Sequence, residues 1–266
     1  MIIILFLLFI VSTISSSCGS MNGIIGNDIN HISSTYVQGQ NIEILERLSP
    51  REYEGSNDSS LITIITSEAI DTIPEWCFSR ISSLKVVLLR GKDIVVESNA
   101  FYACKNLQTI NLNNVIECGE NAFKMTSIDS VRMEMCECIE DFAFANCTKL
   151  REVSLSESIK KIGDFAFSTD TALIKINVPN GVIGRCCFMG CNQLQEVRLG
   201  KVSVVGESAF LDCTSLKEIT IPESVIEIKG EAFAGCSKLQ IVRVFSRKTK
   251  IANNAFDDNT IIEYIN

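Results

Sequence analysis

Cysteine is the residue type in this sequence with the widest range of chemistry. The chain has 266 residues and contains 12 cysteines but a single histidine, His31. Thiols in this number can form disulfides, bind zinc, or fill a core as small apolar side chains. Zinc sites built from thiols usually carry two C-x-x-C pairs, and Cys136, Cys138 and Cys147 do not provide them. We therefore predict no metal site, and we expect His31, as a lone loop histidine, to be exposed and without a catalytic role.

Most of the cysteines keep a fixed spacing from a phenylalanine. Five of them stand three residues after a Phe, namely Cys104, Cys147, Cys191, Cys213 and Cys236. If copies of this pattern stack, these thiols lie about 5 Å apart, within disulfide range, but their parallel side chains oppose disulfide geometry. We predict that they are free, buried thiols that offer S–H to backbone carbonyls. Cys18, Cys138 and Cys186 are the predicted reactive or paired thiols.

The sequence contains no recognisable catalytic motif. A Ser-His-Asp triad or a zinc hydrolase needs histidines that the sequence lacks, and no Gly-rich phosphate loop stands between a strand and a helix. The charge, with 24 Lys and Arg against 32 Asp and Glu, gives a net value of -8. An acidic chain without a basic tract is a poor ligand for nucleic acid. We therefore predict a protein that is not an enzyme, needs no cofactor and does not bind nucleic acid.

The phenylalanines that set the cysteine spacing recur nine times along the chain. They are Phe78, Phe101, Phe123, Phe144, Phe167, Phe188, Phe210, Phe233 and Phe256, separated by 21 to 23 residues. An Ala or Cys precedes each one, and a Leu or Ile follows six residues later, or five in the third copy. Apolar and polar residues then alternate, as in Val197-Arg198-Leu199, which is the pattern of a strand with one buried face. A period of 20 to 29 residues with one strand per copy is typical of leucine-rich-repeat solenoids.

Stacking of the copies explains the repeated columns of similar residues. One copy cannot bury its apolar face alone, whereas neighbouring coils bury it as one continuous core. The small residue before each Phe must then lie where neighbouring coils approach closely. We predict a structural ladder made of the five cysteines named above together with Phe101, Phe144, Phe167, Phe210 and Phe233.

One copy shows the pattern of a known family almost completely. It contains Val205-Gly206, Ala209-Phe210, Cys213, Leu216, Ile219, Ile221 and Pro222. With these residues, the stretch from about Leu61 to Ile265 resembles the BspA-like leucine-rich repeats of surface antigens. The predicted fold is α/β: a right-handed leucine-rich-repeat solenoid with a concave parallel β-sheet and short helical or irregular segments on the convex side. The resemblance further implies a secreted or cell-surface, non-enzymatic binding module, often an adhesin.

We divide the chain into three parts. Residues 1–17 begin with an apolar run followed by small residues, which is typical of a secretory signal peptide and shorter than the about 20 residues of a membrane-spanning helix. A lipoprotein with Cys18 at its N-terminus is the alternative. Residues 18–60 form a leader or a cap, in which Asn57 begins an N-x-S sequon and is the predicted glycosylation site. Residues 61–266 form the solenoid, with nine repeats and a partial first coil. No transmembrane anchor is evident, so we expect a secreted protein or one on the extracellular surface.

The outward residues of the strands form the predicted binding face on the concave sheet. Its charged members are Arg132, Glu152, Lys175, Glu196, Arg198, Glu218 and Arg243. The predicted partner is a protein or glycoprotein that lies across several coils, with adhesion as the outcome. Two alternatives stay open. The charges merely pair with one another, at about 0–1 kcal/mol per exposed pair, or the protein is structural and stacks end to end through an open terminal coil.

Overall fold

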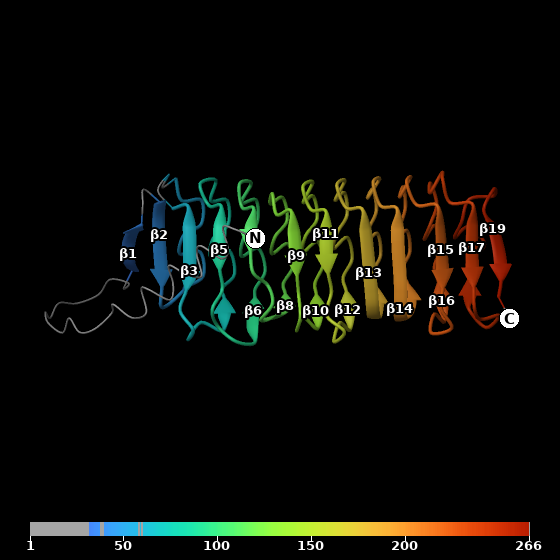
Figure 1. The fold of residues 1–266 in the computed structure, drawn as a ribbon, viewed down its shortest axis with the longest axis horizontal. Helices are drawn as coiled ribbons and strands as arrows, with labels where there is room; N and C mark the ends of the chain where they lie inside the picture. The colour runs from blue at the N-terminus through green and yellow to red at the C-terminus, as the bar shows by residue number, and fades with distance from the viewer. Residues whose placement is uncertain (1–31, 38–39, 58, 60, 266) are drawn as a thin grey trace, which may run out of the picture. The chain divides into compact units, whose positions relative to one another are not determined.

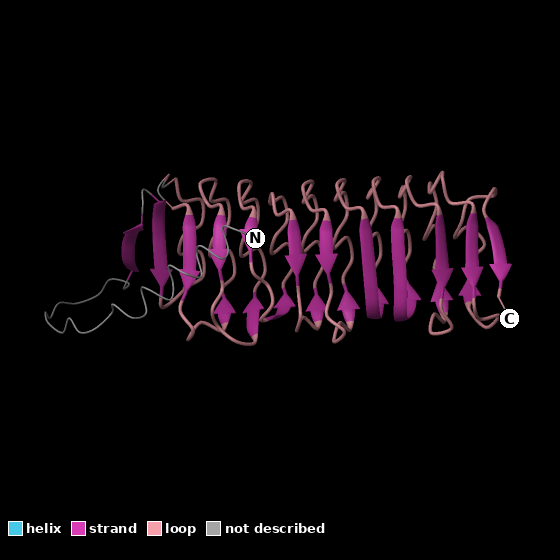
Figure 2. Ribbon diagram, in the orientation of Figure 1, coloured by secondary structure: helices cyan, strands magenta, loops and turns pink. Residues whose placement is uncertain are grey.

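The computed structural model describes residues 32–37, 40–57, 59 and 61–265. The predicted signal peptide, Cys18 and His31 lie outside these residues. The described part of the chain consists of strands and turns and contains no helix (Figure 2). Its coils are stacked in a row, so that each coil lies beside the previous one in the sequence (Figure 1).

The coils contribute strands to two ladders of mostly parallel strands. The first ladder contains β2 (Gln40–Leu45), β3 (Thr63–Thr66), β5 (Val86–Leu88), β7 (Thr109–Ile110), β9 (Ser130–Arg132), β11 (Glu152–Ser154), β13 (Lys175–Ile183), β14 (Glu196–Val205), β15 (Glu218–Ile221), β17 (Ile241–Val244) and β19 (Ile261–Tyr264). The second ladder contains β4 (Thr72–Ile73), β6 (Ile94–Val96), β8 (Val115–Cys118), β10 (Cys138–Ile139), β12 (Lys161–Ile162), β16 (Glu227–Ile228), β18 (Lys250–Ile251) and the C-terminal ends of β13 and β14. At the N-terminal end, β1 (Ile32–Val37) pairs with β2 in the antiparallel direction. The fold is therefore a β-solenoid built on parallel pairing.

The first ladder differs from the single concave sheet predicted from the sequence. Its hydrogen bonds form three separate groups, from β1 to β7, from β9 to β14 and from β15 to β19. The break between β7 and β9 coincides with the repeat that is one residue shorter, between Phe123 and Ile128. The other break follows β13 and β14, which run on into the second ladder, whereas β15 ends before Pro222. The second ladder is continuous from β4 to β18 and keeps the coils in register.

The α/β class and the helical alternative for the convex segments are not confirmed, because these segments are irregular turns. Each turn from Phe78 to Phe233 carries a left-handed residue two places before and two places after the Phe, as in Ser208 (φ 52) and Asp212 (φ 60) around Phe210. An α-helix requires consecutive right-handed residues, so this alternation interrupts it. The turn backbone bonds to the next coil instead: the Phe210 N–H donates to the Ala232 carbonyl at 2.7 Å.

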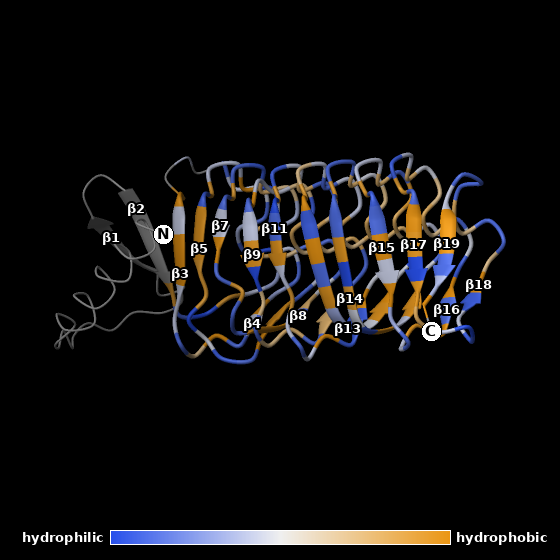
Figure 3. Cartoon of the chain, turned by 45° about the vertical axis from the view of Figure 1, so that its right-hand side comes forward, coloured by the Kyte–Doolittle hydropathy of each residue, from blue (hydrophilic) through white to orange (hydrophobic). Residues whose placement is uncertain are grey.

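The core is a stack of phenylalanine rings that runs through the coils. From Phe78 to Phe256, successive ring centroids on this column lie 4.9 to 5.4 Å apart with nearly parallel planes. All but Phe256 are fully buried, as are the Ala or Cys residues that precede these rings. Polar residues interrupt the apolar ones along β14, β15 and β17 (Figure 3), and these polar positions face outward.

A further coil stands before Leu61, and the repeat pattern does not identify it. Tyr53 occupies the Phe position, with its ring 5.3 Å from that of Phe78, and the left-handed residues Arg51 and Gly55 flank it at the usual spacing. The spacing from Tyr53 to Phe78 is 25 residues, and Glu52 replaces the small residue, so the column pattern is lost in the sequence. A search that allowed Tyr for Phe and a longer period would have found it.

Candidate functional site

The predicted binding face lies on the first ladder, where the alternation of each strand points its charged side chains outward. Arg132 (β9), Glu152 (β11), Lys175 (β13), Glu196 and Arg198 (β14) and Glu218 (β15) are exposed, and Arg243 (β17) is half-buried. Parallel register places Glu152 beside Lys175, and Lys175 beside Glu196. Positive and negative side chains therefore alternate across neighbouring coils, as expected for a surface that pairs with itself or with a mixed-charge partner.

The structure does not place the seven residues on one sheet. Five of them belong to the hydrogen-bonded group from β9 to β14, and Glu218 and Arg243 belong to the group from β15 to β19. Before β9 the same outward columns become uncharged and more buried, with Val86 and Leu88 in one coil and Thr109 and Asn111 in the next. The charged surface thus begins at β9.

Each arginine on this face has an acidic neighbour. Arg132 pairs with Glu134 at 2.8 Å, and Arg243 pairs with Glu218 at 2.7 Å, while Arg198 forms an ion pair with Glu196. The hydrogen bond that Arg243 donates to Glu218 raises the pKa of Arg243. Most of these side chains are exposed, so each pair contributes only about 0–1 kcal/mol to stability and can exchange its partner for an external group.

The five thiols that stand three residues after a Phe link the turns of neighbouring coils by hydrogen bonds. Each of the five donates S–H to the carbonyl oxygen of the Phe one coil earlier, at Sγ–O distances of 2.9 to 3.2 Å. All five are buried, and every cysteine in the described part of the chain is free. Burial raises the pKa of Cys104 and of Cys236 to about 12. Because the thiolate is the reactive form, these groups act as small hydrogen-bond donors.

Of the cysteines predicted to be reactive, the structure describes Cys138 and Cys186, and the thiol pKa of each is raised above its ordinary value. Cys138 is half-buried and donates S–H to Glu140 at 2.8 Å. Burial and this carboxylate raise the pKa of Cys138 to about 12, and burial raises that of Cys186. Among the described residues, no group of His, Cys, Asp and Glu side chains is arranged to hold a metal ion. Asn57 is exposed, and its glycosylation stays a prediction.

Asp170 occupies the thiol column, and the repeat pattern gives no signal for its role. It stands three residues after Phe167, between Cys147 and Cys191, and its side chain is fully buried. The Cys147 N–H donates to Asp170 Oδ1 at 2.7 Å, while Oδ2 has no hydrogen-bond partner among the described residues. Burial raises the pKa of Asp170 well above its ordinary value.

The repeated part of this chain matches the sequence pattern of a known family. The sequence pattern described as "BspA type Leucine rich repeat region" matches residues 17–128, 91–195 and 181–266, with 6 copies. The chain belongs to this family. Its members are identified by the repeat, and the repeat accounts for the buried Phe and Cys columns. No curated protein matches the chain.

Two solved structures show the same architecture as this BspA-type chain. A leucine-rich repeat protein from Bacteroides ovatus ATCC 8483 is similar with a TM-score of 0.71 and 22% identity, over 90% of this chain and 71% of that one. The T. pallidum leucine rich repeat protein is similar with a TM-score of 0.52 and 21% identity, over 78% of this chain and 87% of that one. At these identities the likeness shows the fold alone.

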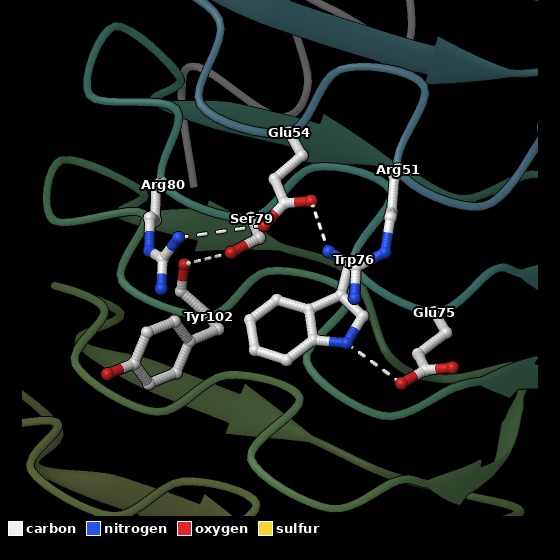
Figure 4. A network of polar contacts seen from close by, with 7 residues as sticks. All are labelled: Arg51, Glu54, Glu75, Trp76, Ser79, Arg80 and Tyr102. Atoms are coloured by element: carbon white, nitrogen blue, oxygen red, sulfur yellow. Dashed lines mark hydrogen bonds and ion pairs between the residues drawn. The ribbon is translucent and has the colours of Figure 1, made fainter.

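An aromatic and arginine cluster on the turn side is a second surface feature of this BspA-type chain. The ring of Trp76 lies 6.0 Å from that of Tyr102, and the Arg51 and Arg80 guanidinium carbons lie 5.1 and 5.8 Å from the Trp76 ring. Figure 4 shows both arginines reaching Glu54, which lies between them. Trp, Tyr and Arg are the residue types that dominate binding hot spots. Here they also tie three coils together, because they come from three neighbouring turns.

The repeat pattern did not point to this cluster, because Trp76 and Tyr102 occupy variable positions beside the Phe column. One signal for the cluster was available in the sequence, because its single Trp, Trp76, stands two residues before the repeat residue Phe78. The described residues form no helix that could cross a membrane.

Proposed function

We propose that this chain is a secreted or surface-displayed recognition module that binds a protein or glycoprotein partner through the charged strand face. The strand face consists of the seven charged residues from Arg132 to Arg243 named above. Adhesion is the favoured outcome. The family membership supports a binding module, because such repeat domains provide an extended surface in place of a catalytic pocket.

The observation that carries the proposal is the row of outward charged side chains on adjacent, in-register strands. Adjacent strands lie about 4.8 Å apart, so Lys175 and Arg198 can contact one extended segment laid across β13 and β14. Arginine provides five donors in a fixed plane and is enriched at binding hot spots. The weak ion pairs of the strand face cost little to exchange for contacts with the partner.

A four-fold alanine variant tests this proposal. Arg132, Lys175, Arg198 and Arg243 are replaced together, and the matched control replaces four exposed lysines outside the strand face, namely Lys105, Lys149, Lys201 and Lys238. Wild type and both variants are immobilised and exposed to labelled cell-surface extracts. We expect at least one protein to be retained by the wild type and by the control but lost by the strand-face variant. Equal retention by all three proteins would place recognition elsewhere.

The second candidate function is a structural one, in which copies stack end to end. It is favoured by β19, which pairs only with β17 among the described strands. Ile262 of β19 is 38% exposed, whereas its neighbour Val242 in β17 is fully buried. Light scattering tests this alternative with the variant Ile262→Asp. Mass that grows with concentration in the wild type and not in the variant supports stacking, and a monomeric wild type excludes it.

A further inference from the structure

The second ladder carries two grooves of opposite charge on one face. The acidic groove has a volume of about 530 Å³ and is lined by Glu75, Val95, Glu97, Ser98, Glu117, Gly119, Glu120, Glu140 and Asp141. The basic groove has a volume of about 580 Å³, and its charged lining residues are Lys160, Lys161, Asp164, Arg185, Glu207 and Lys229. The lining of the acidic groove, as far as the chain is described, contains no Lys or Arg. We call the surface that holds both grooves the second-ladder face.

The linings of the two grooves adjoin between β10 and β12, two neighbouring strands near the middle of the row of coils in Figure 1. At this boundary the two charges already pair within one chain, where Lys161 Nζ lies 2.6 Å from Glu140 and Lys160 pairs with Glu137. The ring stack from Tyr53 to Phe144 lies on the acidic side of the boundary. The stack from Phe167 to Phe256 contains the same number of rings and lies on the basic side.

We propose that two copies of this chain pair through their second-ladder faces, antiparallel to each other, about a twofold axis at the boundary between β10 and β12. Such an axis reverses the order of the coils and places the acidic groove of each copy on the basic groove of the other. The pairing is separate from the proposed strand-face recognition, because it uses the other ladder. It also differs from end-to-end stacking, because a twofold contact closes with two copies.

The register of the ladder identifies the opposing residues. The β13 coil faces the β8 coil of the second copy, so Arg185 lies opposite the second copy's Glu120. The β14 coil faces the β6 coil, so Val204 lies opposite the second copy's Val95. Both pairs stand at matching positions relative to their Phe, three residues before it for the charged pair and six for the valines. Beside the axis the same register places Lys160 opposite the second copy's Glu137, but it also places Asp164 opposite the second copy's Asp141, and these like charges weaken the contact.

Charge complementarity favours a second copy over other partners. A polyanion would be attracted by the basic groove and repelled by the acidic one, and a cationic partner would meet the reverse. A surface that is acidic at one end and basic at the other matches both grooves, and this chain carries such a surface itself. The ion pairs of Lys161 with Glu140 and of Arg185 with Asp164 join exposed and half-buried side chains, so they exchange at little cost.

The size of the face predicts a weak dimer. The eight strands that the axis pairs, from β4 to β16, extend about 34 Å at about 4.8 Å spacing, and the four-residue width at about 3.3 Å per residue is about 13 Å. The total area buried by two copies is then about 900 Å², in the range of weak interfaces. We therefore expect a salt-sensitive dimer with a dissociation constant on the order of 10 µM, since electrostatic pairing between exposed charges weakens as salt increases.

Sedimentation velocity on the purified chain tests the pairing, over about 1–200 µM protein at low and high salt. We expect a monomer–dimer equilibrium that shifts at least about 10-fold toward monomer at high salt. Arg185→Glu and Glu120→Arg should each weaken the dimer about 10-fold or more, because like charges then face each other twice per dimer. The double variant restores opposite charges across the axis and should return within about 3-fold of the wild type.

The control variant is Arg198→Glu, which makes the same change at an exposed arginine of the first ladder and should leave the dimer unchanged. Thermal unfolding of every variant confirms that it folds. A wild type that stays monomeric at the highest concentration and low salt overturns the proposal. A double variant as weak as the singles, or an Arg198→Glu variant as weak as Arg185→Glu, also overturns it.

Discussion

Asp170 should make the protein less stable as the pH rises from mild acid, and replacing it should remove this dependence. The side chain is fully buried, and one of its two oxygens has no partner among the described residues. Ionising such a carboxyl without a counter-charge costs several kcal/mol. Burial raises its pKa in the folded chain, so the folded state keeps the proton that the unfolded chain releases near pH 4.

The sign follows from proton binding. Above the unfolded pKa, the folded state binds more protons than the unfolded state, so the free energy of unfolding falls as pH rises until the folded pKa is reached. Each pH unit in this window lowers the free energy of unfolding by up to about 1.4 kcal/mol. The groups that face Asp170 are the thiols of Cys147, Cys187 and Cys191, and burial raises the pKa of each, so they stay neutral in this range.

Asp170→Cys is the informative replacement, because the coils on either side already hold a cysteine in this column. Cys147 and Cys191 donate S–H to the Phe carbonyl one coil earlier, and the same register assigns the Phe144 carbonyl to position 170. Urea unfolding at pH 4, 5, 6 and 7, under reducing conditions, measures the difference between wild type and variant. We expect this difference to grow in favour of the variant with rising pH. Asp212→Asn, at an exposed acid, is the control and should run parallel to the wild type.

A difference between wild type and Asp170→Cys that stays constant from pH 4 to pH 7 would refute the reasoning. It would mean that the folded and unfolded states release the proton over the same pH range. The burial and the missing partner of Oδ2 would then have no electrostatic consequence.

Two further predictions concern the ladder. Phe210→Ala should lower the free energy of unfolding by about 3–5 kcal/mol, because its ring is fully buried between two neighbours. Phe256→Ala should cost less, because its ring is partly exposed and stacks on Phe233 alone among the described rings; urea midpoints in the opposite order would contradict this. The native, unreduced protein should react with a thiol probe at no more than about three sites, whereas the urea-unfolded protein should react at most cysteines, since a buried thiol is protected from modification. An unfolded protein with almost no free thiol would instead indicate disulfides.

The period of the phenylalanines was sufficient to predict the solenoid, because every coil needs the same buried column. It could not predict the turn geometry. The left-handed residues at the turns include Phe142, Phe165 and Glu231, which have no preference for that conformation. Their conformation is imposed by hydrogen bonds between coils, as in Phe165 N–H to Arg185 O at 2.8 Å. Such bonds depend on the neighbouring coil, so no local pattern in the sequence reports them.

The candidate surfaces were only partly predictable for a related reason. The outward positions of the strands follow from period-2 alternation, and the structure places Arg132, Lys175 and Arg198 outward as expected. Two other features depend on where each strand ends, which the alternation does not fix. They are the break between β14 and β15 and the second ladder, which β13 and β14 join at their C-terminal ends. The Trp76 and Tyr102 cluster depends on side chains from three coils, which are more than 20 residues apart in the sequence.

The hydrogen bonds of the turn explain which columns are available for function. From Phe78 to Phe233 the Phe N–H donates to the carbonyl of the residue before the next Phe, and in five of these coils the Phe carbonyl accepts S–H from the next coil, as in Phe188 with Ala209 and Cys213. A small residue before the Phe and a thiol three places after it therefore contribute to stacking in the coils that carry them. These thiols cannot face a partner, because they are buried. Recognition must therefore use the columns that stacking leaves unconstrained. In this chain these are the strand face with alternating charge, the bipolar second-ladder face and the aromatic turns.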